Sequence, residues 1–365
     1  MKILAVIGTR PEAIKMAPVV RRFKEDPDLE VRVCATGQHR ELLTSALAEL
    51  GLRADHDLAV MRPAQEPGET LGRLLVLLDR VLAREKPDLV LVQGDTTTCL
   101  AGALAAFHRK APVGHVEAGL RTFDLSQPFP EEANRVLTDS VSSLHFAPTP
   151  AAARNLRAEG ADPALVFMTG NTVVDSLKWA LAQDGGFQSP VLRRLPKGGR
   201  LAVVTLHRHE SFGPPLESAC RGILAACRRL PDLRWVYPEH PNPRVRSARA
   251  FLRHPRITVC KSLGYLDFTR LLRRAEFVVT DSGGVQEEAA VLGKRVLVAR
   301  EKTERPEILP EWGALTGSDP EKIAAGAVRL ASGRRRAPPA GSNPFGDGRA
   351  AERIHAAVMR WRHER

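Results

Sequence analysis

The chain lacks long apolar runs, is poor in aromatic residues and has no cysteine spacing typical of a metal site. No apolar run among the 365 residues approaches the length of about 20 that spans a bilayer. The apolar start, residues 1–7, is too short for the core of a signal peptide and continues directly into Gly8. Five scattered cysteines are typical of reduced thiols, so we expect a cytoplasmic protein with no membrane partner.

The formal net charge is +12, which suits nucleic acid, a membrane surface or an anionic substrate. Only 5% of the residues are aromatic and none is interleaved among the basic stretches. A platform that stacks single-stranded nucleic acid is therefore not expected. Most of the charge comes from arginine pairs typical of solvated helix faces, and we assign part of it to steering a phosphorylated substrate.

Apolar runs of strand length alternate with amphipathic segments of helical length along almost the whole chain. Such alternation favours parallel α/β sheets, and continuous apolar runs are typical of strands covered by helices on both faces. The predicted strands lie at residues 3–7, 31–35, 89–92, 113–116, 144–147, 166–168, 201–205, 234–237, 257–260, 277–280 and 295–298. Predicted helices between the first strands lie at residues 12–23, 40–50, 70–84 and 98–108.

The alternation restarts after a polar stretch rich in proline and glycine, residues 188–199. The sequence therefore predicts two Rossmann-like domains whose parallel sheets face a deep cleft. We place the N-terminal domain at residues 1–169 and the C-terminal domain at residues 170–347. A last helix, within residues 348–365, is expected to pack back on the first domain.

Three carboxylates in the first third of the chain occupy positions that suit acid–base chemistry. Asp95 and Glu117 follow buried-looking runs of strand length, and Glu131 lies at an expected helix start. Ligands of open parallel sheets bind outside the carboxyl ends of the strands, so the three groups are predicted to meet at one crevice. Simpler roles stay open: a helix N-cap for Asp95, and a first-turn charge for Glu131 that pairs with Arg135.

The turn after the first predicted strand has the composition of a phosphate-binding site. Residues 8–12 open a helix there, and its first backbone N–H groups, together with Arg10 and Lys15, suit a phosphate. An ordinary strand–helix turn is the simpler alternative, because one short motif does not decide the matter.

The second half of the chain has its own candidate site at strand ends. His207 follows a strand, where it suits binding of a diphosphate or protonation of a leaving oxygen, although a lone histidine is more often structural. A turn at a later helix start offers backbone N–H groups to a phosphate, and a carboxylate one turn on suits a ribose diol. An arginine in a polar loop completes the set. These residues are Ser282, Gly283 and Gly284 in the turn, Glu288 beyond it and Arg305 in the loop.

Short blocks in order along nearly the whole chain give it a specific resemblance. The blocks are GTRPEAIK at 8–15, TGQHRE at 36–41, QGDTTT at 93–98, GHVEAGLRT at 114–122, PFPEEANR at 128–135, TGNTVVD at 169–175, TLHRHE at 205–210, DSGGVQEE at 281–288, TERPE at 303–307 and NPFGDG at 343–348. Together they resemble the non-hydrolysing UDP-N-acetylglucosamine 2-epimerases.

The resemblance implies a GT-B fold, a homodimer and conversion of UDP-GlcNAc to UDP-ManNAc by anti elimination of UDP to 2-acetamidoglucal and syn re-addition. It implies no metal and no nicotinamide or other cofactor. By analogy with the family, the catalytic residues are Asp95, Glu117, Glu131 and His207. The residues implied to bind the UDP-sugar are Arg10, Lys15, Arg135, Phe268, Ser282, Gly283, Gly284, Glu288 and Arg305.

Bacterial members of this family have a second site where UDP-GlcNAc acts as an activator, and Gln38, Arg208 and His240 match it. The loop at residues 61–71 is longer than usual, and Glu239 stands where an apolar residue is common. We therefore expect activation to be weakened or altered.

Four other functions compete with this interpretation. A hydrolysing relative would release free ManNAc and UDP, and a 2-epimerase of a modified UDP-HexNAc would use the same chemistry on another sugar. A GT-B glycosyltransferase would need an acceptor site and has less use for three carboxylates. A nucleotide-sugar sensor would leave its ligand unchanged.

Overall fold

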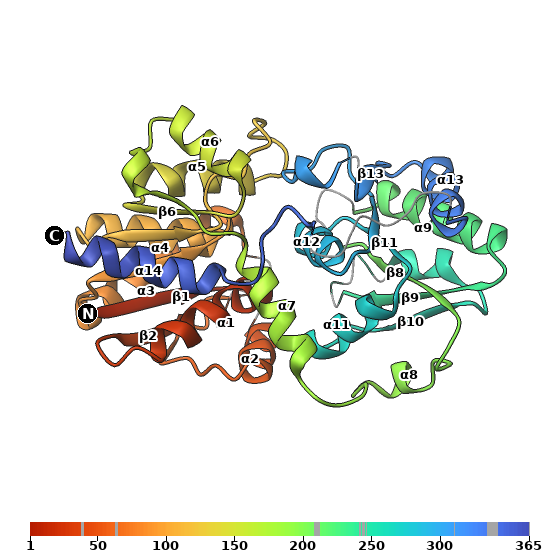
Figure 1. The fold of residues 1–365 in the computed structure, drawn as a ribbon, viewed down its shortest axis with the longest axis horizontal. Coiled ribbons are helices and arrows are strands. Elements are labelled where there is room, and N and C mark those ends of the chain that lie inside the picture. The colour runs from red at the N-terminus through yellow and green to blue at the C-terminus, as the bar shows by residue number, and fades with distance from the viewer. Residues whose placement is uncertain are drawn as a thin grey trace. The chain divides into compact units, whose positions relative to one another are not determined.

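The computed structural model describes residues 1–37, 40–62, 65–207, 212–240, 242, 245, 247–309, 311–333 and 342–364. The chain forms two compact units (Figure 1). The first unit comprises Met1–Lys178 and Phe345–Arg365, and the second comprises Trp179–Pro344.

The first unit is built on a seven-stranded sheet in the order β3-β2-β1-β4-β5-β6-β7, with every strand pair parallel. Strands β1 and β4 are apolar and buried along nearly their whole length, which follows from the helices that cover both faces. The strands are β1 (Lys2–Ile7), β2 (Glu30–Ala35), β3 (His56–Asp57), β4 (Leu89–Gln93), β5 (Val113–Val116), β6 (Leu144–Ala147) and β7 (Val166–Met168).

Helices follow nearly every strand of this sheet. They are α1 (Arg10–Lys24), α2 (Arg40–Glu49), α3 (Pro67–Glu85), α4 (Thr97–His108), α5 (Glu131–Val141), α6 (Pro150–Ala158), the 3₁₀ turn η1 (Pro163–Leu165) and α7 (Thr172–Ala182). Apolar residues of α3 and α4, among them Leu74, Leu78 and Ala101, pack against β1 and β4 to form the core of one face.

The expected return of the last helix to the first unit is confirmed. Helix α14 (Ala350–His363) lies along α1 (Figure 1), and the ring of His355 packs edge-on against Phe23, with centroids 5.2 Å apart. The carboxylate of Asp175 on α7 accepts hydrogen bonds from the first two N–H groups of α14, at 3.2 and 2.9 Å. This cap satisfies donors that a helix start leaves unpaired.

Helix α7 crosses the division between the units, which falls between Lys178 and Trp179, beyond the boundary at residue 169 that the sequence suggested. The start of α7 is held in the first unit by two side-chain hydrogen bonds. Asn171 donates to Glu117 at 2.9 Å, and Ser176 donates to the carbonyl of Ile14 at 2.5 Å.

The second unit repeats the plan with a six-stranded, all-parallel sheet in the order β10-β9-β8-β11-β12-β13. Its strands are β8 (Arg200–Thr205), β9 (Leu233–Glu239), β10 (Ile257–Lys261), β11 (Phe277–Thr280), β12 (Arg295–Val298) and β13 (Gly313–Leu315). Its helices are α8 (Pro190–Arg193), α9 (Pro214–Arg229), η3 (Ser247–Leu252), α11 (Tyr265–Arg274), α12 (Gly283–Val291), η4 (Pro306–Ile308) and α13 (Pro320–Ala331). Trp235 and Phe277 pack edge-to-face in its core, with centroids 5.7 Å apart.

All the strands that the apolar runs predicted are present, and two others were missed. Strands β3 and β13 are only two and three residues long, and β3 consists of a histidine and an aspartate, so neither has an apolar run. Among the described residues, no helix is both long and apolar enough to cross a bilayer.

Candidate active site

The predicted catalytic residues of the first unit follow neighbouring strands at the point where the strand order reverses. The chain runs from β1 outward through β2 and β3, then returns to β4 on the other side of β1. Ligands of such sheets bind at this switch point. A Cβ atom at Gly8 would lie 2.1 Å from the hydroxyl oxygen of Thr98, so only glycine lets the β1–α1 turn pass this close to α4.

Glu117 is a buried carboxylate in an unusual backbone conformation. Its φ angle is +69°, a left-handed value that side chains other than glycine rarely adopt. The carboxylate is ion-paired with the buried ammonium of Lys15 and accepts a hydrogen bond from Asn171 at 2.9 Å. Strained, buried and charged residues concentrate at functional sites, so Glu117 is the strongest catalytic candidate of this unit.

Asp95 lies at the end of the adjacent strand and is held by helix α5. Gly94, with φ +76°, makes the turn that presents it. The carboxylate of Asp95 forms an ion pair with Arg135, whose side chain is almost fully buried. Arg135 also pairs with Glu132 at 2.6 Å, and the amide of Asn134 donates to the carbonyl of Asp95 at 2.9 Å.

Helix α5 also carries Glu131, which is its first residue, as the sequence predicted. The side chain is half-buried. The loop from Glu117 to α5 is folded back onto the helix, because the N–H groups of Thr122 and Phe123 donate to Glu132 at 2.7 and 2.9 Å. The three carboxylates thus come from β4, β5 and the start of α5.

Glu12 is a further buried carboxylate that links two of the strand ends. It accepts hydrogen bonds from the N–H of Gly8 at 3.0 Å and from the hydroxyl of Thr96 at 2.7 Å. Burial raises the pKa of Glu12 to about 7, although these hydrogen bonds act in the opposite direction. The Glu12 carboxylate therefore connects the β1–α1 turn, which suits a phosphate, to the turn that carries Asp95.

We expect the stability of the protein to fall between pH 5 and pH 8, and Glu12→Gln to reduce that fall. The folded pKa of about 7 lies above the ordinary value of 4.5 for a glutamate, so stability present below pH 4.5 is lost as the pH rises through 7. A difference of about 2.5 pKa units corresponds to about 3 kcal/mol. Urea unfolding of wild type and Glu12→Gln at both pH values measures this. The exposed Glu352→Gln is the control, and equal pH dependence in all three proteins would contradict the expectation.

The candidate site of the second unit also lies where its strand order reverses, between β8 and β11. The N–H of His207, just after β8, donates to the buried carboxylate of Asp281, just after β11, at 2.9 Å. The ring of His207 stacks on that of His240, with centroids 5.4 Å apart and planes 14° from parallel. The candidate catalytic histidine thus contacts one of the three predicted activator-site residues.

Helix α12 begins directly after this strand end with Ser282 as its N-cap, and no side-chain hydrogen bond of Ser282 caps it. A Cβ atom at Gly283 would lie 2.3 Å from the guanidinium of Arg305, whereas a Cβ at Gly284 would meet open space. Arg305 is buried and ion-paired with Glu287 and Glu304. The arginine that the sequence suggested therefore lies against the predicted phosphate turn.

The remaining predicted residues of the second unit fall on α11 and α12. Glu288 is buried on α12, and Phe268 is partly buried on α11, where it packs against an apolar cluster of the core. Gln38 and Arg208 lie outside the described residues.

Comparison with known proteins identifies the family of this chain. Residues 21–359 match the model of the family described as UDP-N-acetylglucosamine 2-epimerase. The UDP-N-acetylglucosamine 2-epimerase of Escherichia coli (strain K12) is 44% identical, over 98% of this chain and 98% of that protein. The chain belongs to the UDP-N-acetylglucosamine 2-epimerase family.

Solved structures support the same assignment for this epimerase. UDP-GlcNAc 2-epimerase from Neisseria meningitidis bound to UDP-GlcNAc matches with a TM-score of 0.92 and 38% identity, covering 99% of this chain and 100% of that one. The glycotransferase of kitacinnamycin, at 15% identity, matches with a TM-score of 0.61 over 99% of this chain and 95% of that one, and shares the fold alone. The epimerase thus has two parallel-sheet α/β domains of the GT-B type.

Sequence reasoning missed three residues at the site of this epimerase: Asn171, which contacts Glu117, Asn134, which contacts Asp95, and Glu12. Asn171 follows β7 through Gly170. Asp95 and Glu117 were singled out because each is a polar residue just past the end of a strand. The same rule would have found Asn171. Glu12 and Asn134 lie within helices and carry no such signal.

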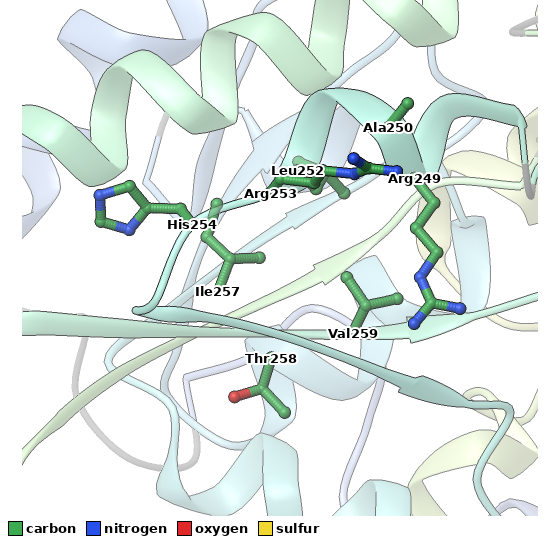
Figure 2. Close-up of a pocket in the computed structure, with 8 residues that line it drawn as sticks. All are labelled: Arg249, Ala250, Leu252, Arg253, His254, Ile257, Thr258 and Val259. Atoms are coloured by element: carbon green, nitrogen blue, oxygen red, sulfur yellow. The ribbon is translucent and has the colours of Figure 1, made fainter.

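The epimerase also has a cavity away from the predicted residues. It measures about 840 Å³ and lies between η3 and β10, at the outer edge of the second sheet (Figure 2). Its lining combines apolar Leu252, Ile257 and Val259 with the exposed Arg249 and Arg253. None of the predicted site residues lines it, so the strand-end residues remain the candidate active site.

Proposed function

We propose that this epimerase interconverts UDP-GlcNAc and UDP-ManNAc without net hydrolysis. The observation that carries the proposal is Glu117, a buried carboxylate at a strand end that is held in left-handed backbone by Lys15 and Asn171. A relative of the same fold has been solved with UDP-GlcNAc bound, which supports this substrate.

The reaction needs a base, an acid and a stabilised leaving group. Removal of the C2 proton and cleavage of the bond from C1 to the diphosphate oxygen form the C1–C2 double bond of 2-acetamidoglucal and release UDP. Re-addition of UDP at C1 and protonation of C2 on the opposite face complete the inversion. Asp95, Glu117 and Glu131 share the proton transfers in this proposal, since positioned carboxylates with altered surroundings suit general acid–base catalysis.

The departing UDP carries the negative charge that must be stabilised. We assign this task to His207 and to the N–H groups at the start of α12, with Arg10 and Lys15 as further cations. Glu288 is assigned to the ribose diol and Phe268 to the uracil.

Incubation with UDP-GlcNAc in D2O, followed by proton NMR, tests the proposal. We expect the C2 proton signal to disappear while UDP-ManNAc accumulates. Free ManNAc together with UDP would instead identify a hydrolysing enzyme. An unchanged spectrum would contradict the proposed substrate.

A matched pair of glycine variants tests the assignment of the α12 turn. Gly283→Ala should weaken UDP binding by about 10-fold or more, because its Cβ must displace Arg305 and the turn with it. Gly284→Ala, one residue on, has open space and should change the affinity by less than about threefold. Calorimetric titration with UDP measures both. An unchanged affinity for UDP in Gly283→Ala would contradict the assignment.

The homodimer and the altered activation stay predictions. If activation is weakened, we expect the rate to depend hyperbolically on the concentration of UDP-GlcNAc. We also expect the rates of the two directions of epimerisation to be equal without added activator. A lag or a sigmoidal response would contradict this.

A further inference from the structure

A buried charged cluster that the proposed chemistry does not use lies behind Asp95 and Glu117. It consists of His115 on β5, Asp139 on α5 and Arg121 in the loop after β5. The exposed fraction of each side chain is 5% or less. Such a cluster needs an explanation, because burying charged groups is costly even when they are paired.

Both ring nitrogens of His115 face acceptors. Nδ1 lies 2.6 Å from the carboxylate of Asp139, and Nε2 lies 2.7 Å from the carbonyl oxygen of Gly94. Burial raises the pKa of Asp139, but the neighbouring His115, His145 and Arg121 outweigh it and hold the pKa below its usual range. The ring of His115 thereby connects Asp139 on α5 to the turn after β4.

Asp139 accepts two further hydrogen bonds. Its second oxygen accepts from the guanidinium of Arg121 at 2.7 Å and from the N–H of Gly119 at 3.2 Å. His145 on β6 lies 3.5 Å from its first oxygen. Arg121 in turn pairs with Glu159 at the end of α6, at 2.5 Å. The Asp139 carboxylate is therefore contacted by His115 and Arg121, with His145 nearby and Glu159 on the far side of Arg121.

The contacts of the cluster flank both predicted catalytic carboxylates. Gly94, whose carbonyl His115 binds, immediately precedes Asp95. His115 lies two residues before Glu117 on the same chain segment, and Gly119, whose N–H Asp139 binds, lies two residues after it. Movement of the His115 ring or of the Asp139 carboxylate would therefore move both turns.

We propose that His115 and Asp139, supported by Arg121, are positioning residues that fix the turns presenting Asp95 and Glu117. This rests on the proposed function in one respect, which is that these two carboxylates act on the substrate. Misplacement of a reacting group by about 1 Å can cost about 100-fold in rate, so the effect of disturbing the cluster should fall on turnover.

The chain supplies a matched control pair of the same chemistry. His355 on α14 and Asp26 lie 2.7 Å apart, with Arg22 3.4 Å from the other ring nitrogen of His355. This pair joins α14 to the segment after α1, and its hydrogen bonds reach neither Asp95 nor Glu117. Asp26→Asn therefore removes a His–Asp contact of the same unit without touching the turns.

The test compares Asp139→Asn, His115→Gln, His115→Asn and Asp26→Asn. We expect kcat to fall about 10- to 100-fold in the first three, at a temperature where melting curves show each fully folded. KM and the affinity for UDP should stay within about threefold, and Asp26→Asn should match wild type. His115→Gln keeps a donor near the place of Nε2, which contacts Gly94, and His115→Asn keeps one near Nδ1, which contacts Asp139. Comparison of their kcat values therefore shows how much of the loss comes from each contact.

Nitrogen-15 NMR of histidine-labelled wild type provides a readout that is independent of turnover. Both ring nitrogens of His115 are expected to give the signals of hydrogen-bonded nitrogens, which are assigned by their loss in a His115 variant. A His115 ring nitrogen without a hydrogen bond, unchanged kcat in folded variants, or failure of all three cluster variants to fold would overturn the proposal. Wild-type protein that leaves UDP-GlcNAc unchanged would instead count against the proposed function, because the ring signals would still report on the cluster.

Discussion

Glu117→Gln is expected to lower turnover by about 10²- to 10⁴-fold while the affinity for UDP stays nearly unchanged. Glutamine keeps the shape of glutamate but cannot take up a proton. Oε2 of Glu117 receives donors from Lys15 and Asn171, and a glutamine there keeps an acceptor oxygen but loses the ion pair with Lys15. The lost rate thus reflects both the missing base and a disturbed contact.

Initial rates with UDP-GlcNAc and calorimetric titration with UDP separate these effects. Glu352→Gln, an exposed glutamate on α14, removes the same charge far along the chain from the strand ends and should match wild type. Turnover of Glu117→Gln within threefold of wild type would remove Glu117 from the mechanism.

The left-handed backbone of Glu117 is held by main-chain contacts as well as by its side chain. A residue other than glycine at φ +69° costs about 1 kcal/mol or more, which surrounding contacts must offset. Here the strand-end N–H groups of Glu117 and Ala118 both donate to the carbonyl of Phe146, at 3.1 and 3.2 Å. The conformation is therefore held by β6 as well as by the side-chain contacts.

Much of this site could be predicted from the sequence because its residues follow strands. Apolar runs located β4, β5 and β11, and a parallel sheet brings the residues after such strands to one edge. This placed Asp95 and Glu117 after neighbouring strands, and Ser282 at the start of α12. The same logic applies in each unit where the strand order reverses.

The partners of these residues could not be predicted, because they depend on packing between distant segments. Helical spacing suggested Glu131 as a partner of Arg135, and the structure adds Glu132 and Asp95 as partners that it did not suggest. Spacing along one helix cannot reveal a contact with a strand end that is 40 residues away in the sequence. The polar loop around Arg305 gave no sign that this arginine is buried.

The two units use different means to hold charge at their strand ends. In the first unit, carboxylates are held by Lys15 and Arg135, whose side chains are buried. In the second unit, Asp281 accepts the backbone N–H of His207 and Arg305 lies against a glycine turn. Carboxylates held in place suit proton transfer, and N–H groups beside buried cations suit an anionic leaving group, which supports the division of tasks that we propose.

Asp95→Asn is expected to lower turnover by about 10²- to 10³-fold and to destabilise the protein by about 1–2 kcal/mol. The change removes a negative charge from beside Arg135, whose side chain is 2% exposed. Because Asp95 itself is 27% exposed and Glu132 still pairs with Arg135, the loss of stability should stay below that of breaking a fully buried pair.

Asp79→Asn is the matched control, because Asp79 forms an exposed two-bond ion pair with Arg109 in the same unit. It should leave turnover unchanged and alter stability by less than about 1 kcal/mol. Urea unfolding measures the stability of both variants. Proton NMR in D2O then follows deuterium entry at C2 and release of UDP. Asp95→Asn that exchanges the C2 proton at the wild-type rate would exclude Asp95 from the proton transfers and leave them to Glu117 and Glu131.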